Sequence, residues 1–79
     1  MNISNKIRII RKSFCCTVEE FAEKMNVSRQ TIHQWEAGKT YPIIEKIQLL
    51  SKLFEIPVSA LVDDEYDLII RLDIKKRTK

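Results

Sequence analysis

The sequence predicts an all-α fold of five short helices, followed by a tail whose pattern is that of a β-strand. The 79 residues include only one glycine and two prolines, whereas the many turns of an all-β domain need more of both. Apolar residues recur at three- and four-residue steps, which is the period of a helix face. Hydroxyl side chains stand just before two of these stripes, where helices take their N-caps. Together these observations favour helices joined by short turns.

Each expected helix has a boundary signal of its own. Thr17 and Glu20 form a capping box before the second helix, and Ser28 caps the third. Asn26 and Gly38 suit the left-handed backbone with which helices often end. The expected helices cover about residues 3–13, 18–25, 29–36, 42–54 and 57–62, with Pro42 and Pro57 opening the last two.

The inner faces follow from the helical period. The expected inward residues are Ile3, Ile7, Ile10, Phe14, Val18, Phe21, Ala22, Met25, Ile32, Trp35, Ile44, Ile47, Leu50, Phe54, Val58 and Leu61. Cys16 is expected as a small core residue and Cys15 in a turn. We therefore interpret residues 1–62 as one domain.

Residues 63–79 change character. An acidic linker opens this tail, and a basic end, expected to be disordered, closes it. Between them, residues 66–74 alternate in polarity, which predicts a strand that joins two chains. Its apolar side consists of Leu68, Ile70, Leu72 and Ile74. Two alternatives stay open: the tail continues as a helix, since Leu68, Ile69 and Leu72 also fit a helical stripe, or dimerisation runs through the fourth and fifth helices alone.

Charge and composition limit the function. The net charge is +3, which is compatible with a nucleic-acid partner. No apolar run approaches a membrane span and the first residues lack the pattern of a signal peptide, so we expect no membrane contact and a cytoplasmic location. Cys15 and Cys16 are adjacent and His33 has no partner at metal or nucleophile spacing. We therefore expect no enzyme, no metal, no cofactor and no small-molecule ligand.

The third expected helix has the chemistry of a base-reading helix. Arg29, Gln30, His33 and Gln34 lie on its outer side, without an acid before Glu36. Arginine can bind guanine O6 and N7 through two hydrogen bonds, and glutamine can do the same to adenine N6 and N7. An ordinary solvated helix face would also be polar, so polarity alone leaves both interpretations open.

From Lys6 to Val62 the sequence resembles the Cro/C1-type (XRE-like) helix-turn-helix family of phage repressors and bacterial regulators. The segments that carry the resemblance are IRIIRK at 7–12, TVEEFAEK at 17–24 and VSRQTIHQWEAGK at 27–39. The resemblance implies a five-helix, lambda-repressor-like domain that binds double-stranded DNA. Val18 departs from it by replacing a frequent Gln, and Cys15, Asn26 and Glu55 stand where Gly is frequent.

The resemblance also implies roles for individual residues. Arg11 is expected to approach the DNA backbone and to pair with Glu36. The positions that face bases are Ser28, Arg29, Gln30, His33 and Gln34. The positions that contact phosphates are Arg11, Lys12, Thr17, Thr31, Lys39 and Thr40.

The expected function is a sequence-specific transcriptional regulator, a homodimeric repressor on a pseudo-palindromic operator. Two such domains place their reading helices in successive major-groove faces about 34 Å apart. The alternative is a protein-interaction module that reuses the fold, or an antitoxin of the same build. Acidic residues on the outer side of the third helix would favour an interaction module, and that side has none before Glu36.

Overall fold

The computed structural model describes residues 3–63, and every regular element in that range is an α-helix. The all-α prediction is therefore confirmed for these residues. The helices are α1 (Ile3–Ser13), α2 (Val18–Met25), α3 (Arg29–Glu36), α4 (Ile44–Phe54) and α5 (Val58–Val62). The predicted strand over 66–74, with Leu68, Ile70, Leu72 and Ile74, lies outside the described residues.

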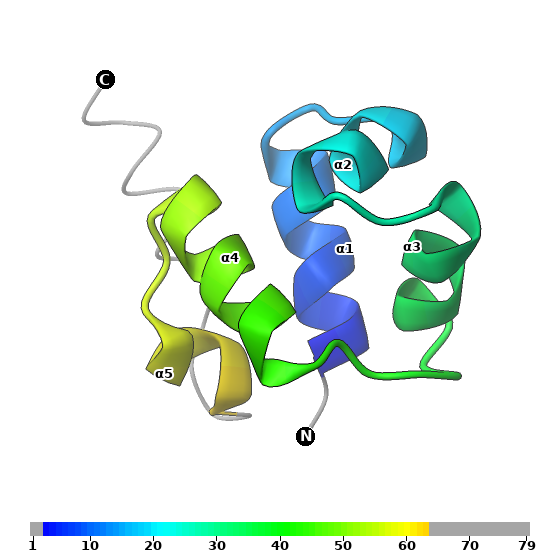
Figure 1. The fold of residues 1–79 in the computed structure, drawn as a ribbon. Coiled ribbons are helices and arrows are strands. Elements are labelled where there is room, and N and C mark those ends of the chain that lie inside the picture. Colours follow the sequence, from blue (N-terminus) through cyan, green and yellow to red (C-terminus); the bar gives the residue numbers. More distant parts are fainter. Residues whose placement is uncertain (1–2, 64–79) are drawn as a thin grey trace.

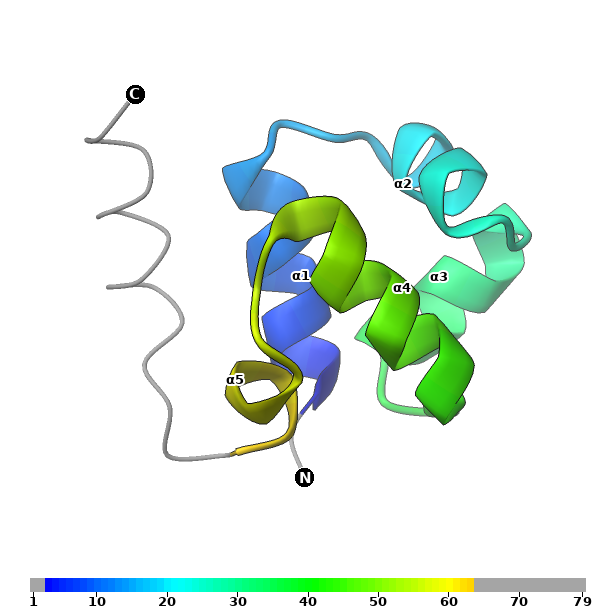
Figure 2. The same cartoon turned by 60° about the vertical axis from the view of Figure 1, so that its left-hand side comes forward.

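Helix α1 runs through the middle of the domain (Figure 1). Helices α2 and α3 lie to one side of it in this view, and α4 and α5 lie to the other. Figures 1 and 2 both place α3 and α5 at opposite ends of the domain. All five helices contribute to one apolar core, which consists of Ile3, Ile7, Ile10, Phe21, Ala22, Met25, Ile32, Trp35, Ile47, Leu50, Phe54, Ile56, Ala60 and Leu61.

The four links between the helices share one backbone feature. Each link contains a residue with positive φ: Cys15 at 56°, Asn26 at 56°, Gly38 at 74° and Glu55 at 54°. This left-handed conformation turns the chain sharply and costs a residue with a Cβ atom more than it costs glycine. The three residues other than glycine stand at positions where glycine is frequent in the family that the sequence resembles. These turns therefore adopt the left-handed conformation without a glycine.

Two lysines fasten helix ends that the sequence had not connected. Lys6 of α1 is buried, and its Nζ donates to the carbonyl oxygen of Ala60 at 2.9 Å and to that of Asp63. Lys46 of α4 donates to the carbonyl oxygen of Met25 at 3.0 Å. Helix C-termini leave carbonyl groups without backbone partners and carry partial negative charge, so an ammonium group stabilises them.

The structure corrects three predictions, two about buried residues and one about the start of α4. Ile44 was predicted to be buried, but 58% of it is exposed because it is the first residue of α4 and extends beyond the core. Phe14 follows the end of α1 and is 38% exposed, although its ring centroid lies 4.9 Å from that of Phe54. Pro42 precedes α4 by two residues instead of standing in its first turn.

Candidate nucleic-acid interface

The turn between α2 and α3 fixes the direction of α3. Asn26, in the left-handed conformation, donates its backbone N–H to the carbonyl groups of Ala22 and Glu23 at the end of α2. Two residues later the Ser28 hydroxyl accepts the backbone N–H of Thr31 at 3.1 Å, which caps α3. Backbone groups at both ends of the turn thus find hydrogen-bond partners within one helical turn, as the sequence predicted. Helix α3 therefore leaves α2 at a defined angle.

Two apolar side chains hold α3 onto the domain. Ile32 and Trp35 are buried in the core, three residues apart on one face of the helix. The prediction that Trp35 is a core residue is confirmed. Because these two residues occupy the inner face, the remaining residues of α3 are half-buried or exposed. Helix α3 packs against both α1 and α2.

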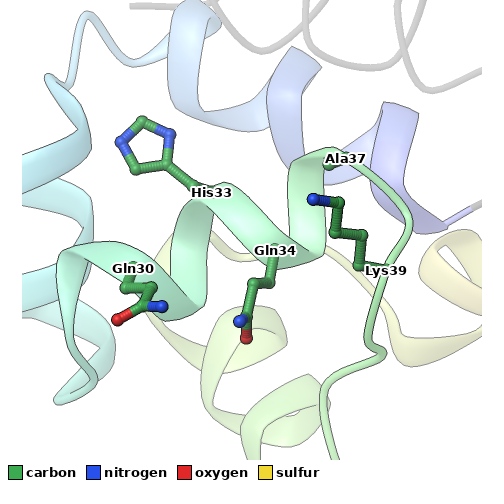
Figure 3. A pocket seen from close by; sticks show the side chains of 5 residues that line it. All are labelled: Gln30, His33, Gln34, Ala37 and Lys39. Carbon is green, nitrogen blue, oxygen red and sulfur yellow. The ribbon is translucent and has the colours of Figure 1, made fainter.

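The outer face carries the side chains that were predicted to read bases. Ser28, Arg29, Gln30 and His33 are exposed, and Gln34 is half-buried. In Figure 3, Gln30 and Gln34 project from the same side of α3, whereas His33 projects from another side. The two glutamines are four residues apart, one helical turn, so their amide groups can address neighbouring positions on one ligand.

A shallow hollow of about 390 Å³ lies on this face (Figure 3). Its lining residues are Gln30, His33, Gln34, Ala37 and Lys39. Sequence reasoning missed Ala37, whose methyl group is exposed just after α3 ends. The available signal was its spacing of four residues from His33, which continues the same helix face. The hollow therefore combines amide donors and acceptors, an imidazole, a methyl group and an ammonium group.

An ion pair joins the end of α3 to α1. The Arg11 guanidinium donates from Nε to one carboxylate oxygen of Glu36 at 2.6 Å and from Nη2 to the other at 3.1 Å. Its Nη1 donates to the carbonyl oxygen of Cys16, just before α2, at 3.2 Å. The side chains of Arg11 and Glu36 are only 16% and 11% exposed. Arg11 therefore ties α1, the α1–α2 link and α3 together.

The carboxylate of Glu36 raises the pKa of Arg11 above its ordinary value, first through the hydrogen bond and also through its charge. Arg8, which sequence reasoning missed, adds a second link from α1. Its Nη2 donates to the backbone carbonyl oxygen of Glu36 at 2.7 Å, and its Nε lies 4.0 Å from the Glu36 carboxylate. The signal that could have found it is its spacing of three residues from Arg11, which puts both guanidinium groups on one face of α1.

The residues predicted to contact phosphates occupy different settings. Lys12, Lys39 and Thr40 are exposed, and Thr31 is half-buried. Thr17 is exposed but already caps α2: its hydroxyl accepts the backbone N–H of Glu20 at 3.1 Å, while its own N–H donates to the Glu20 carboxylate at 2.8 Å. The Thr17 backbone N–H, followed by the Thr17 side chain, lowers the pKa of the Glu20 carboxyl group below its ordinary value.

None of the helices within residues 3–63 is long and apolar enough to cross a membrane. No group of three or more histidine, cysteine or acidic side chains comes together in that range to hold a metal ion.

Two helices joined by a tight turn, with the second fastened inward by Ile32 and Trp35, define a helix-turn-helix domain. Residues 7–61 match the sequence profile of the family described as Helix-turn-helix. The chain therefore belongs to this family, in its Cro/C1-type (XRE-like) branch. No solved structure matches the chain.

Three curated relatives are similar to the chain. The HTH-type transcriptional activator BcrR of Enterococcus faecalis is 33% identical over 78 residues, covering 99% of this chain and 38% of the relative. The uncharacterized HTH-type transcriptional regulator YobD of Bacillus subtilis (strain 168) is 27% identical, covering 90% of this chain and 66% of the relative. The cryptic phage CTXphi transcriptional repressor RstR of Vibrio cholerae is 33% identical, covering 77% and 55%. The chain thus spans 38% to 66% of the length of these relatives.

Breaking the Arg11–Glu36 pair on one side should destabilise the domain more than removing both charges. Glu36→Ala leaves a half-buried guanidinium without its carboxylate, so the free energy of unfolding should fall by about 3 kcal/mol. The double variant Arg11→Met/Glu36→Leu should recover much of this loss, because no unpaired charge remains. Urea unfolding followed by circular dichroism measures both values.

The matched control is Glu23→Ala, which removes an exposed carboxylate of α2 and should change stability by at most about 0.5 kcal/mol. A Glu36→Ala protein as stable as the Glu23→Ala protein would show that the ion pair does not hold α3 in place.

Proposed function

We propose that this protein is a transcriptional regulator that binds double-stranded DNA and reads its sequence by placing α3 in the major groove. The observation that carries the proposal is the outer face of α3, where Arg29, Gln30 and Gln34 point away from a core that holds the opposite face. Arginine and glutamine are the side chains whose paired hydrogen bonds distinguish guanine and adenine in that groove. The exposed methyl group of Ala37 offers an apolar contact for the methyl group of thymine.

Contacts to the sugar-phosphate backbone would set the position of α3. Lys39 and Thr40 lie in the loop after α3, Thr17 and Thr31 lie at the starts of α2 and α3, and Lys12 lies in the last turn of α1. Such contacts supply much of the affinity and fix the register, whereas base contacts supply the sequence preference. The Arg11 guanidinium already donates hydrogen bonds to Glu36 and to the Cys16 carbonyl group. We therefore assign Arg11 a phosphate contact only through its remaining N–H groups.

The names of the relatives support regulation of transcription and include an activator and a repressor. We propose repression, in the cytoplasm, as the activity of this chain. Occupation of DNA that overlaps a promoter requires only the contacts described above, while activation requires an additional contact with the transcription machinery.

Substitutions should separate base contacts from phosphate contacts. On the best duplex selected from a random library, Arg29→Ala, Gln30→Ala and Gln34→Ala should each cost about 1–3 kcal/mol and relax the preference at particular base pairs. Lys39→Ala should instead weaken binding to every duplex and reduce the salt slope by about one unit. Fluorescence anisotropy over a series of salt concentrations measures both effects.

Lys52→Ala is the matched control for Lys39, since it removes an exposed ammonium group near the end of α4, away from α3 (Figure 1). It should leave both affinity and salt slope close to those of the wild type. The proposal is wrong if the wild-type protein enriches no sequence from the library, or if the three α3 variants bind the selected duplex as the wild type does.

We also propose that the regulator is a homodimer on a pseudo-palindromic operator, joined by the apolar side of residues 66–74. The support is the alternating pattern of that segment, because an unpaired strand edge with an apolar side gains by pairing with a second copy across a two-fold axis. The dimer would place two copies of α3 in successive major-groove faces and so raise the affinity that one domain provides.

A charge on the apolar side of the tail should break this dimer. Ile70→Lys should weaken dimerisation at least about tenfold, since a lysine would be buried between two chains. Ile69→Lys, on the other side of the alternation, should leave dimerisation unchanged. Sedimentation equilibrium measures the dimer constant. Equal weakening by both variants would favour a helical tail, and no effect of Ile70→Lys would exclude this side as the dimer contact.

A further inference from the structure

An ion pair outside the core lies at the start of the reading helix. Arg29 is the first residue of α3, and Glu19 lies in the first turn of α2. The Nη1 of Arg29 donates to a carboxylate oxygen of Glu19 at 3.1 Å. Both side chains are well exposed, at 66% and 61%. A residue proposed to bind a DNA base is therefore held by a carboxylate of the neighbouring helix.

The Glu19 carboxylate keeps its charge at neutral pH. Its own backbone N–H, followed by the Arg29 side chain, lowers the pKa of Glu19 below the ordinary value. Its place in the first turn of α2 also suits an anion, because the N-terminus of a helix carries partial positive charge. Arg29 therefore faces a permanent negative charge whenever DNA approaches.

Stability does not account for this pair. Ion pairs between exposed side chains contribute little to folding, because solvent screens them and both side chains lose conformational freedom. The effect of the Glu19 charge on Arg29 is more specific. It offsets part of the attraction between the guanidinium and any phosphate, and that attraction does not depend on sequence.

The geometry leaves the base-reading edge of Arg29 available. Glu19 accepts from Nη1, at one side of the planar guanidinium. The Nε and Nη2 groups form the other edge, whose two parallel N–H bonds match guanine O6 and N7. A guanidinium held at Nη1 also loses fewer orientations when that edge binds, since it is ordered in advance.

We propose that Glu19 is a specificity-determining residue, which orients Arg29 toward a guanine edge and weakens its binding to phosphates of any sequence. This inference rests on the proposed function of α3. It assigns a guanine-containing base pair in duplex DNA as the ligand of Arg29. The proposal also explains why Glu19, whose negative charge alone would oppose DNA binding, stands beside a base-reading residue.

The test compares two affinities in each variant, that for the selected operator duplex and that for a scrambled duplex of the same composition. Their ratio is the discrimination. Glu19→Gln should raise binding to the scrambled duplex more than binding to the operator, so that discrimination falls roughly two- to fivefold, the range that exposed ion pairs cover. Glu23→Gln, the matched control on α2, makes the same change in charge and should leave the ratio unchanged.

A double-mutant cycle separates this role from a general effect of charge. In an Arg29→Ala background, Glu19→Gln should no longer change discrimination. The inference is overturned if Glu19→Gln leaves the ratio at the wild-type value, or lowers it equally without Arg29, while the wild type still prefers its operator. A wild-type protein without preference for any duplex would overturn the proposed function itself and the inference with it. Thermal unfolding of each variant verifies that the fold is retained.

Discussion

The Arg11–Glu36 ion pair is the interaction on which the placement of α3 depends. Ile32 and Trp35 bury the inner face of α3, but apolar packing is not directional and tolerates small rotations. The paired hydrogen bonds of a guanidinium with a carboxylate are directional, and here they join the last residue of α3 to α1. The bond from Arg11 to the Cys16 carbonyl group adds the link that leads into α2. One side chain thus sets the relation of all three elements around the candidate interface.

The same polar groups serve the fold and the proposed interface. Ser28 caps α3 and Thr17 caps α2, so their hydroxyl groups are held in place before any ligand arrives. Arg29 is likewise held by Glu19. Groups that are ordered in advance lose less conformational entropy on binding. This favours one defined binding geometry over many loosely held ones. The cost is that each of these groups must keep, share or exchange a bond within the protein when it meets DNA.

Much of the fold follows from the sequence because its signals are local. The Thr17–Glu20 capping box, the Ser28 cap and the left-handed Asn26 depend on residues within one helical turn of each other. Ile44 was wrongly predicted because the helical period gives the direction of a stripe but not how far the core extends along it. The lysine contacts to Ala60 and Met25 join residues 54 and 21 positions apart, and no local pattern contains such partners.

The sequence likewise predicted which side chains form the outer face of α3. The period of α3 separates Trp35 from its outer face, and side-chain chemistry together with the family resemblance suggests what that face binds. The partners of its residues were not predictable, since Arg8 and Glu19 meet α3 only through tertiary packing. Backbone amide chemical shifts in an NMR titration with the selected operator duplex test the central claim most directly. The account predicts the largest changes in α3, at Thr17 and at Lys39 and Thr40, with α5 nearly unchanged. Changes centred on α4 and α5, with α3 unaffected, would contradict it.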